Sequence, residues 1–140
     1  MDSISSLINN PSEKDFLLSF PLEKICANIR DFFVAVEKKK VVGCAALHIY
    51  SCNLAELRSL VVHCSRRKQG IGALLAKSTL KEAEKLGLTR IFALTQAVHF
   101  FNALDFKEVQ KESLPEKVYK DCIYCSKLHN CIEVAMIKLL

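Results

Sequence analysis

A basic segment that contains two glycines, Arg67-Lys68-Gln69-Gly70-Ile71-Gly72, lies between a strand-like run and an amphipathic helix. The N-terminus of a helix presents unpaired N–H groups and partial positive charge, so it binds phosphate. Gly70 and Gly72 would let a ligand approach the backbone closely, and Arg67 and Lys68 add cationic side chains at the rim. A pyrophosphate group needs this combination. The alternative is a basic turn before an ordinary helix, and the spacing alone does not separate the two.

The same segment departs from two common nucleotide-binding motifs. Its lysine does not follow the second glycine, so the segment is not a P-loop. The dinucleotide fingerprint requires a third glycine, and Leu75 stands in that place. The segment therefore matches neither of these two motifs.

A second group of chemically capable residues lies near the C-terminus. Cys122 and Cys125 form a C-x2-C pair, which can bind zinc, and His129 or Cys131 could help to complete four ligands. The sequence supplies no second C-x2-C pair. We therefore favour reduced, packed thiols over a structural zinc ion, and we assign no metal site.

The chain has seven cysteines, an odd number, and its first residues show no basic region followed by an apolar block. Without a secretory signal, we expect reduced thiols and a cytoplasmic location. The four dispersed cysteines are expected to act as small apolar side chains in or near the core: Cys26, Cys44, Cys52 and Cys64.

The composition is that of an ordinary globular protein. Its 140 residues would fill one domain, 1–140, and 51% of them are apolar while 25% are charged. The longest apolar stretches fall far short of the roughly 20 residues that a membrane span needs. The net charge of +5 is modest and aromatic residues do not interleave with the basic ones, so we expect no nucleic-acid partner.

The hydrophobic pattern predicts strands and helices around one mixed α/β sheet. A charged turn separates two runs rich in β-branched and aromatic residues, which indicates an antiparallel hairpin. Gly43 inside the second run suggests a bulge or a close backbone approach, and Gly87 marks a helix end. The expected helices are 4–8, 22–31, 70–86 and 98–104, and the expected strands are 32–36, 41–50, 54–62, 91–95, 106–109 and 134–140.

The pattern Arg-x-x-Gly-x-Gly after an extended strand resembles the acetyl-CoA motif of the GNAT acetyltransferase superfamily. The resemblance covers most of the chain and includes Phe100-Phe101 and Leu104-Asp105-Phe106. It implies a mixed, mostly antiparallel central sheet flanked by helices. Members usually begin with a short strand before the first helix, and that strand is apparently missing here.

A narrower resemblance is carried by several blocks in order. They are similar to N-acetylglutamate synthases of the short form, which acetylate the α-amino group of glutamate at the start of arginine biosynthesis. Phe20 stands where this family tends to have an arginine that holds the substrate carboxylate, and the Arg-x-Ser element of the long form has no counterpart before Val134. The matching blocks are Val42 to His48, Ala55 to Val62, Phe92 to Thr95 and Leu114 to Lys117.

The resemblance implies a cofactor site. The pyrophosphate of CoA would sit on the basic glycine segment, and the pantetheine arm would pair like an extra strand with the backbone from Ser59 to Val62, where two strands splay apart. The implied cofactor-binding residues are Leu60, Val61, Val62, Arg67, Lys68, Gln69, Gly70, Ile71, Gly72 and Ala73.

Acyl transfer to an amine needs a base, a polarised thioester and a proton for the leaving thiolate. Glu56 is the candidate base, acting directly or through water, and its alternative is a surface glutamate paired with a lysine. Backbone N–H groups near Leu60 and Val61 would polarise the thioester oxygen. Asn102 or Tyr119 would lie near the leaving sulfur.

Arg58 could clamp a substrate carboxylate bidentately, or be an exposed strand arginine. Thr95 is the second candidate for acceptor binding. His48 and His63 are expected to be structural, and His99 would flank the acyl site.

The sequence therefore favours an enzyme, an N-acetyltransferase that uses acetyl-CoA with glutamate as acceptor. A first alternative is another amino acid or small amine as acceptor. A second alternative belongs to a different class, a non-catalytic module that binds acyl-CoA or a metal. The expected partner is a small molecule, without nucleic acid or membrane, and a homodimer is left open.

Overall fold

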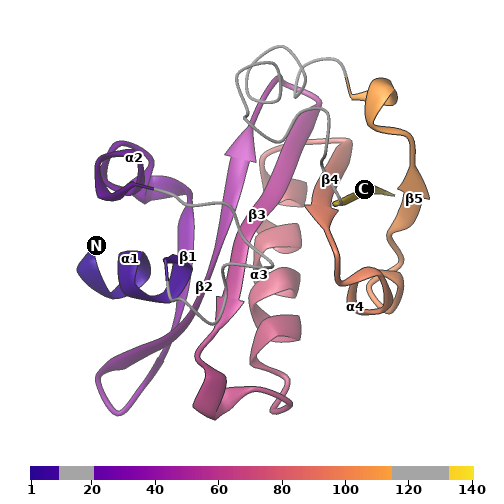
Figure 1. Ribbon diagram of the computed structural model, residues 1–140. Helices are drawn as coiled ribbons and strands as arrows, with labels where there is room; N and C mark the ends of the chain where they lie inside the picture. The colour runs from indigo at the N-terminus through magenta and orange to yellow at the C-terminus, as the bar shows by residue number, and fades with distance from the viewer. Residues whose placement is uncertain (10–20, 115–132) are drawn as a thin grey trace.

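The computed structural model describes residues 1–9, 21–114 and 133–140 (Figure 1). Phe20, Tyr119 and the C-terminal cysteine and histidine cluster lie outside these residues, so the predictions on them are not tested. The elements are α1 (Asp2–Ile8), α2 (Leu22–Ala27), β1 (Phe32–Glu37), β2 (Lys40–Ile49), β3 (Leu54–Val62), α3 (Ile71–Lys85), β4 (Arg90–Thr95), α4 (Val98–Asn102), β5 (Lys107–Val109) and β6 (Val134–Leu139), with 3-10 turns η2 (Ile29–Asp31), η3 (Cys64–Arg66) and η4 (Lys111–Ser113).

The described strands form a six-stranded sheet in the order β1-β2-β3-β4-β6-β5. Neighbours are antiparallel except β3 and β4, which are parallel. That parallel pairing joins only Leu54–Glu56 to Arg90–Phe92, although β3 continues to Val62 and β4 to Thr95. The prediction of a mixed, mostly antiparallel sheet flanked by helices is confirmed, and so is the splay beside β3.

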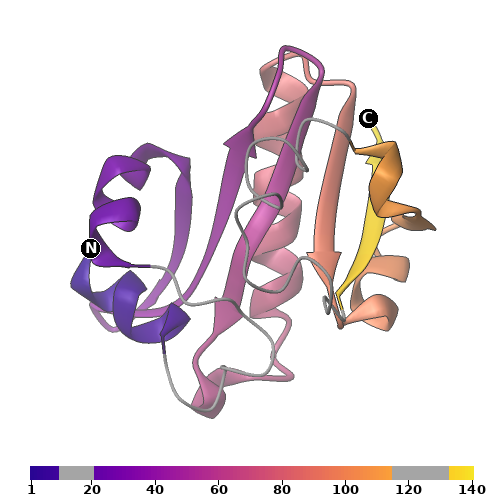
Figure 2. The same cartoon turned by 45° about the horizontal axis from the view of Figure 1, so that its top comes forward.

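Helices cover both faces of the sheet (Figure 2). On one face, α3 packs through Leu75, Ala76, Leu80 and Ala83 against alternate residues of β2 and β3. On the other face, α1 and α2 pack against Cys44 and Val61. The helix predicted over 70–86 ends at Lys85, and Leu86 after it is exposed.

The helix predicted over 22–31 ends earlier, at Ala27. The Asn28 side chain donates from Nδ2 to the carbonyl of Lys24 at 2.8 Å, so it satisfies a carbonyl of the last turn locally. Asparagine side chains compete in this way with continued helix. The chain then turns through η2, which brings Asp31 to the start of β1.

Three of the four dispersed cysteines do not meet the prediction that they lie in or near the core. Cys44 alone of this set is buried, whereas Cys26, Cys52 and Cys64 are exposed. Cys26 lies on the outer side of a short helix, and the other two lie in the turn after β2 and in η3. The exposure of these three cysteines therefore follows from their positions on a helix surface and in turns, and departs from the usual burial of cysteine. Among the described residues, no helix is long and apolar enough to cross a membrane.

Gly43 allows α3 to approach β2 closely. A Cβ atom on Gly43 would lie 3.0 Å from Leu75 Cδ1 and 3.2 Å from the carbonyl oxygen of Val61. The β1–β2 register also shifts beside it, between Ala35 and Val36. Both features that the glycine suggested in the sequence, a bulge and a close approach, are therefore present.

Gly43→Ala is expected to destabilise the protein by about 1–3 kcal/mol, because the methyl group would push a strand carbonyl and a core leucine apart. Urea unfolding measures this change. Gly72→Ala is the matched control, since its Cβ would meet only side chains at ordinary distances, Phe100 at 3.5 Å and Val62 at 3.7 Å. Equal free energies of unfolding for the Gly43 variant and the wild type would show that the added methyl group causes no steric strain.

Candidate active site

A bulge in β3 shapes the region where β3 and β4 separate. Cys44 pairs with Val61 and Ala46 pairs with Arg58, so two residues of β3, Ser59 and Leu60, lie opposite one residue of β2. Ser59 has a φ of 56°, a left-handed value that serine adopts only under constraint. An extra residue of this kind bends a strand and interrupts its ladder, so the bulge turns the end of β3 away from β4.

The thiol of Cys44 supports the bulge. Its Sγ donates to the carbonyl oxygen of Ser59 at 3.4 Å. Burial raises the pKa of the Cys44 thiol to about 12. The group therefore keeps its proton and remains a donor under ordinary conditions, and it acts as a structural thiol.

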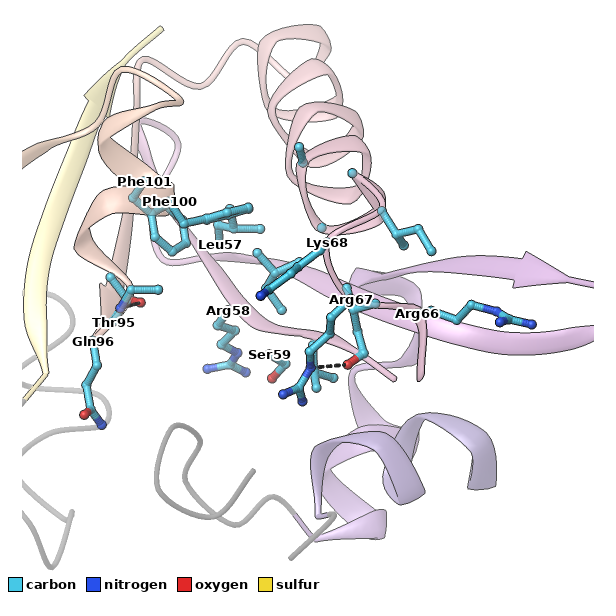
Figure 3. A pocket seen from close by; sticks show the side chains of 18 of the residues that line it. Leu57, Arg58, Ser59, Arg66, Arg67, Lys68, Thr95, Gln96, Phe100 and Phe101 are labelled. Atoms are coloured by element: carbon cyan, nitrogen blue, oxygen red, sulfur yellow. Dashed lines mark hydrogen bonds between the residues drawn. The ribbon is translucent and has the colours of Figure 1, made fainter. Parts of the chain in front are cut away.

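The separation of the strands opens a pocket of about 660 Å³ (Figure 3). One wall comes from β3 and the N-terminus of α3, and the other comes from the end of β4 and from α4. The residues that line it are Leu57, Arg58, Ser59, Leu60, Val61, Val62, Arg66, Arg67, Lys68, Gly70, Ile71, Gly72, Ala73, Leu94, Thr95, Gln96, Ala97, Phe100 and Phe101.

All the ionisable side chains in this described lining are cations: Arg58, Arg66, Arg67 and Lys68. A concave surface of one sign concentrates its field, so the pocket favours an anionic ligand. The apolar floor, with Leu57, Phe100 and Phe101, suits an extended aliphatic group beside the anion. The predicted cofactor residues all line the pocket except Gln69, which is exposed on the loop.

The N-terminus of α3 lies where the sequence predicted an anion site. Gly70 is its N-cap with a φ of 80°, and a Cβ there would have no neighbour within 4 Å. Within the described residues, no side chain caps the helix and no acidic residue lies in its first turn. The first N–H groups of α3 therefore point at the pocket without a side-chain acceptor.

The three basic residues before α3 have different roles. Arg67 donates from Nε to the carbonyl oxygen of Val62 at 3.2 Å, which ties the loop to the end of β3. Lys68, with a φ of 63°, extends across the mouth of the pocket in Figure 3. Arg66 points away from the pocket to Glu37 of β1, with 3.0 Å between Nε and Oε2.

Glu56 and Arg58 form a buried pair on the sheet face that also carries α1 and α2. Glu56 is 3% exposed and accepts a hydrogen bond from the Tyr50 hydroxyl at 3.1 Å. Arg58 Nη1 lies 3.8 Å from Glu56 Oε1, and the arginine side chain is 18% exposed. Glu56 is thus not a surface glutamate paired with a lysine, and Arg58 is not an exposed strand arginine.

His48 and Asp31 extend this pair. His48 Nδ1 lies 3.1 Å from Arg58 Nη2 and 3.1 Å from Asp31 Oδ2. Sequence reasoning assigned His48 a structural role and missed Asp31 and Tyr50. The β2–β3 register, which places His48 opposite Glu56, is the signal that would have connected His48 to the candidate site. His63 has the structural role predicted for it, because its ring accepts from the Ser65 N–H at 3.2 Å and caps η3.

Of the remaining predicted site residues, some line the pocket and others do not. Thr95 lines the pocket, and its hydroxyl oxygen accepts from the Ala97 N–H at 2.8 Å at the end of β4. Asn102 is exposed at the end of α4 and is not among the residues that line the pocket. His99 is also exposed on α4. Phe100, Phe101 and Gln96 line the pocket although the sequence assigned them no role.

The candidate zinc ligands Cys122, Cys125, His129 and Cys131 lie outside the described residues. In the part of the chain that is described, no group of three or more histidine, cysteine or acidic side chains could hold a metal ion.

Comparison with known proteins gives a consistent result. The model of the acetyltransferase (GNAT) family matches residues 2–106. An uncharacterized N-acetyltransferase of Chlorobaculum tepidum is 38% identical over 138 residues, which cover 99% of this chain and 89% of that protein. An amino-acid acetyltransferase of Mycobacterium tuberculosis is 30% identical over 122 residues, or 85% of this chain and 70% of that protein.

Among solved structures, the N-acetylglutamate synthase of Neisseria gonorrhoeae, complexed with coenzyme A and N-acetyl-glutamate, superposes with a TM-score of 0.86 at 24% identity. The match covers all of this chain and 32% of the synthase, and at this identity it shows the fold. The chain likewise spans 26–29% of six further amino-acid acetyltransferases that it matches.

Proposed function

The chain belongs to the acetyltransferase (GNAT) family and is an acyltransferase, and on that premise we propose that it transfers the acetyl group of acetyl-CoA to the α-amino group of glutamate. The observation that carries the proposal is the pocket between β3 and β4, which joins the N-terminus of α3 to Arg58. Arg58 in turn contacts the buried Glu56, which is not itself among the lining residues. The resemblance to N-acetylglutamate synthases supports glutamate, a place at the start of arginine biosynthesis and a cytoplasmic location.

The cofactor end of the reaction follows from the loop. The N–H groups of Ile71, Gly72 and Ala73 and the cations Arg67 and Lys68 bind the pyrophosphate. The β3 edge from Ser59 to Val62 has no β4 partner, so its backbone groups can pair with the amides of the pantetheine arm. The thioester then lies where β3 and β4 separate.

The acceptor end follows from the buried pair. Arg58 holds a carboxylate of the acceptor, and Glu56 takes the proton from the amine through a water molecule. The amine attacks the thioester carbonyl, and backbone N–H groups near Leu60 and Val61 stabilise the oxyanion. Thr95 as an acceptor contact, and Asn102 or Tyr119 near the leaving sulfur, remain predictions.

A second candidate acceptor is an amino acid with one carboxylate. Of the four cations in the described lining, Arg66 points away and Arg67 and Lys68 belong to the cofactor loop. Arg58 is therefore the cation that the described lining offers to an acceptor. One arginine matches one carboxylate, whereas glutamate carries two.

CoA release across a panel of amino acids and amines tests the proposal. Because Cys26, Cys52 and Cys64 are exposed, a thiol reagent would also titrate the protein, so loss of the thioester's ultraviolet absorbance is the better signal. Glutamate is expected to give the highest kcat/KM. If glutamate stays at the background while another amine responds, the glutamate proposal is wrong. CoA binding without turnover for any acceptor would indicate the non-catalytic module.

A further inference from the structure

One ring nitrogen of His48 lies between two charged side chains from different parts of the chain. Asp31 comes from η2, before β1, and Arg58 comes from β3. Both approach the same atom, Nδ1, at 3.1 Å. Arg58 lines the pocket, whereas His48 and Asp31 lie behind it and do not.

These two contacts compete for the nitrogen. An ionised aspartate can only accept a hydrogen bond, and an arginine can only donate one. Nδ1 carries either a hydrogen atom or a lone pair in the ring plane, so it serves one partner at a time. With a hydrogen on Nδ1, His48 donates to Asp31. With a lone pair there, His48 accepts from Arg58 Nη2.

The surroundings hold the ring and the guanidinium in place during this exchange. Glu56 Oε1 lies 3.8 Å from Nη1, the other terminal nitrogen of Arg58. Tyr50 packs edge-on against the His48 ring, with 4.9 Å between centroids, and donates its hydroxyl hydrogen to Glu56. The exchange therefore changes the partner of Nη2 without requiring the arginine to leave the pocket wall.

Water compensates only in part for a lost partner, because the side chains of His48 and Asp31 are 25% and 28% exposed. A hydrogen bond made by a charged group in such a half-buried setting has a substantial effect on nearby equilibria. The state of Nδ1 thus affects how readily Nη2 of Arg58 bonds to anything else.

We propose that His48 and Asp31 are positioning residues that decide whether Arg58 is presented to an acceptor carboxylate. When Nδ1 donates to Asp31, Nη2 turns to the carboxylate in the pocket. When Nδ1 accepts from Arg58, Nη2 is held back against β2. Asp31 and the acceptor carboxylate favour the same state, because each gains a hydrogen bond in it. The inference rests on the proposed function in that it takes Arg58 as the carboxylate contact.

Asp31→Ala tests the inference, because it removes the acceptor that draws the hydrogen to Nδ1. It is expected to raise the KM for glutamate about fivefold to tenfold, the effect of one hydrogen bond, with kcat and the KM for acetyl-CoA unchanged. Asp31→Asn should stay closer to the wild type, because its amide can accept from or donate to Nδ1 and so competes with Nη2 of Arg58 for that nitrogen in either state. The exposed neighbour variant Arg30→Ala is the control and should match the wild type.

The second arm uses His48→Leu, alone and combined with Asp31→Ala. Without Nδ1 the hydrogen bond from Nη2 to His48 is lost, so the single variant should keep the glutamate KM within about twofold of the wild type. The double variant should resemble His48→Leu, which is the non-additivity expected of coupled residues. Thermal unfolding checks that each variant is folded.

Two results would overturn the inference while the proposed function stands: an unchanged glutamate KM in Asp31→Ala, or His48→Leu and Asp31→Ala each raising KM with additive effects. The second pattern is that of a passive scaffold. A wild-type enzyme that acetylates only amines without a carboxylate would overturn the inference together with the proposed acceptor.

Discussion

Gly70→Val is expected to weaken CoA binding about tenfold to a hundredfold, the loss of one or two charge-assisted hydrogen bonds. Gly70 has a φ of 80°, which a β-branched residue does not tolerate, so the loop must change its path before α3. The first N–H groups of the helix would then no longer converge on the pyrophosphate. Isothermal calorimetry with CoA measures the change, and adding Arg67→Ala should weaken binding further.

Gly87 offers a matched control at the other end of the same helix. It also has a φ of 80° and no atom within 4 Å of a Cβ. Gly87→Val should therefore impose a similar backbone strain and a similar loss of stability, but leave CoA affinity unchanged. If both variants bind CoA like the wild type, or both lose affinity equally, the N-terminus of α3 is not the pyrophosphate site.

Glu56→Gln is expected to lower kcat about a hundredfold or more, the usual contribution of a general base. The amide keeps the size of the side chain and can still accept from the Tyr50 hydroxyl, but it cannot take a proton from the amine. The KM for acetyl-CoA should be unchanged. Initial rates at saturating glutamate measure the effect.

Glu108→Gln is the control for this substitution, since Glu108 is exposed on β5. It removes the same charge far from the pair with Arg58. A Glu56→Gln enzyme with kcat within about threefold of the wild type, and with the same dependence on pH, would assign the carboxylate a structural role instead.

Local patterns predicted the frame of the site. The hydrophobic pattern predicted the order of strands and helices, and the glycine segment located the start of α3, because a helix start after a strand is a short-range feature. Gly43 indicated its own close contact for the same reason, since a glycine inside a strand often marks a bulge or a close backbone approach.

The network behind Arg58 was not predictable in this way. The partnership of Asp31, His48 and Arg58 depends on the β2–β3 register. That register shifts at Ser59, where a positive φ in a serine has no local sequence signal. Without this register, nothing in the sequence assigned His48 anything but a structural role. The exposed cysteines show the same limit, because residue type gives average burial but not the face of a short helix or a turn.

The most direct test of the account follows the acetyl group itself. The protein is incubated with glutamate and with acetyl-CoA that carries an isotope label in the acetyl group, and the products are measured by mass spectrometry. The account predicts labelled N-acetylglutamate and CoA in equal amounts, with both lost in Glu56→Gln. Accumulation of CoA without labelled N-acetylglutamate, or label on the protein alone, would contradict it.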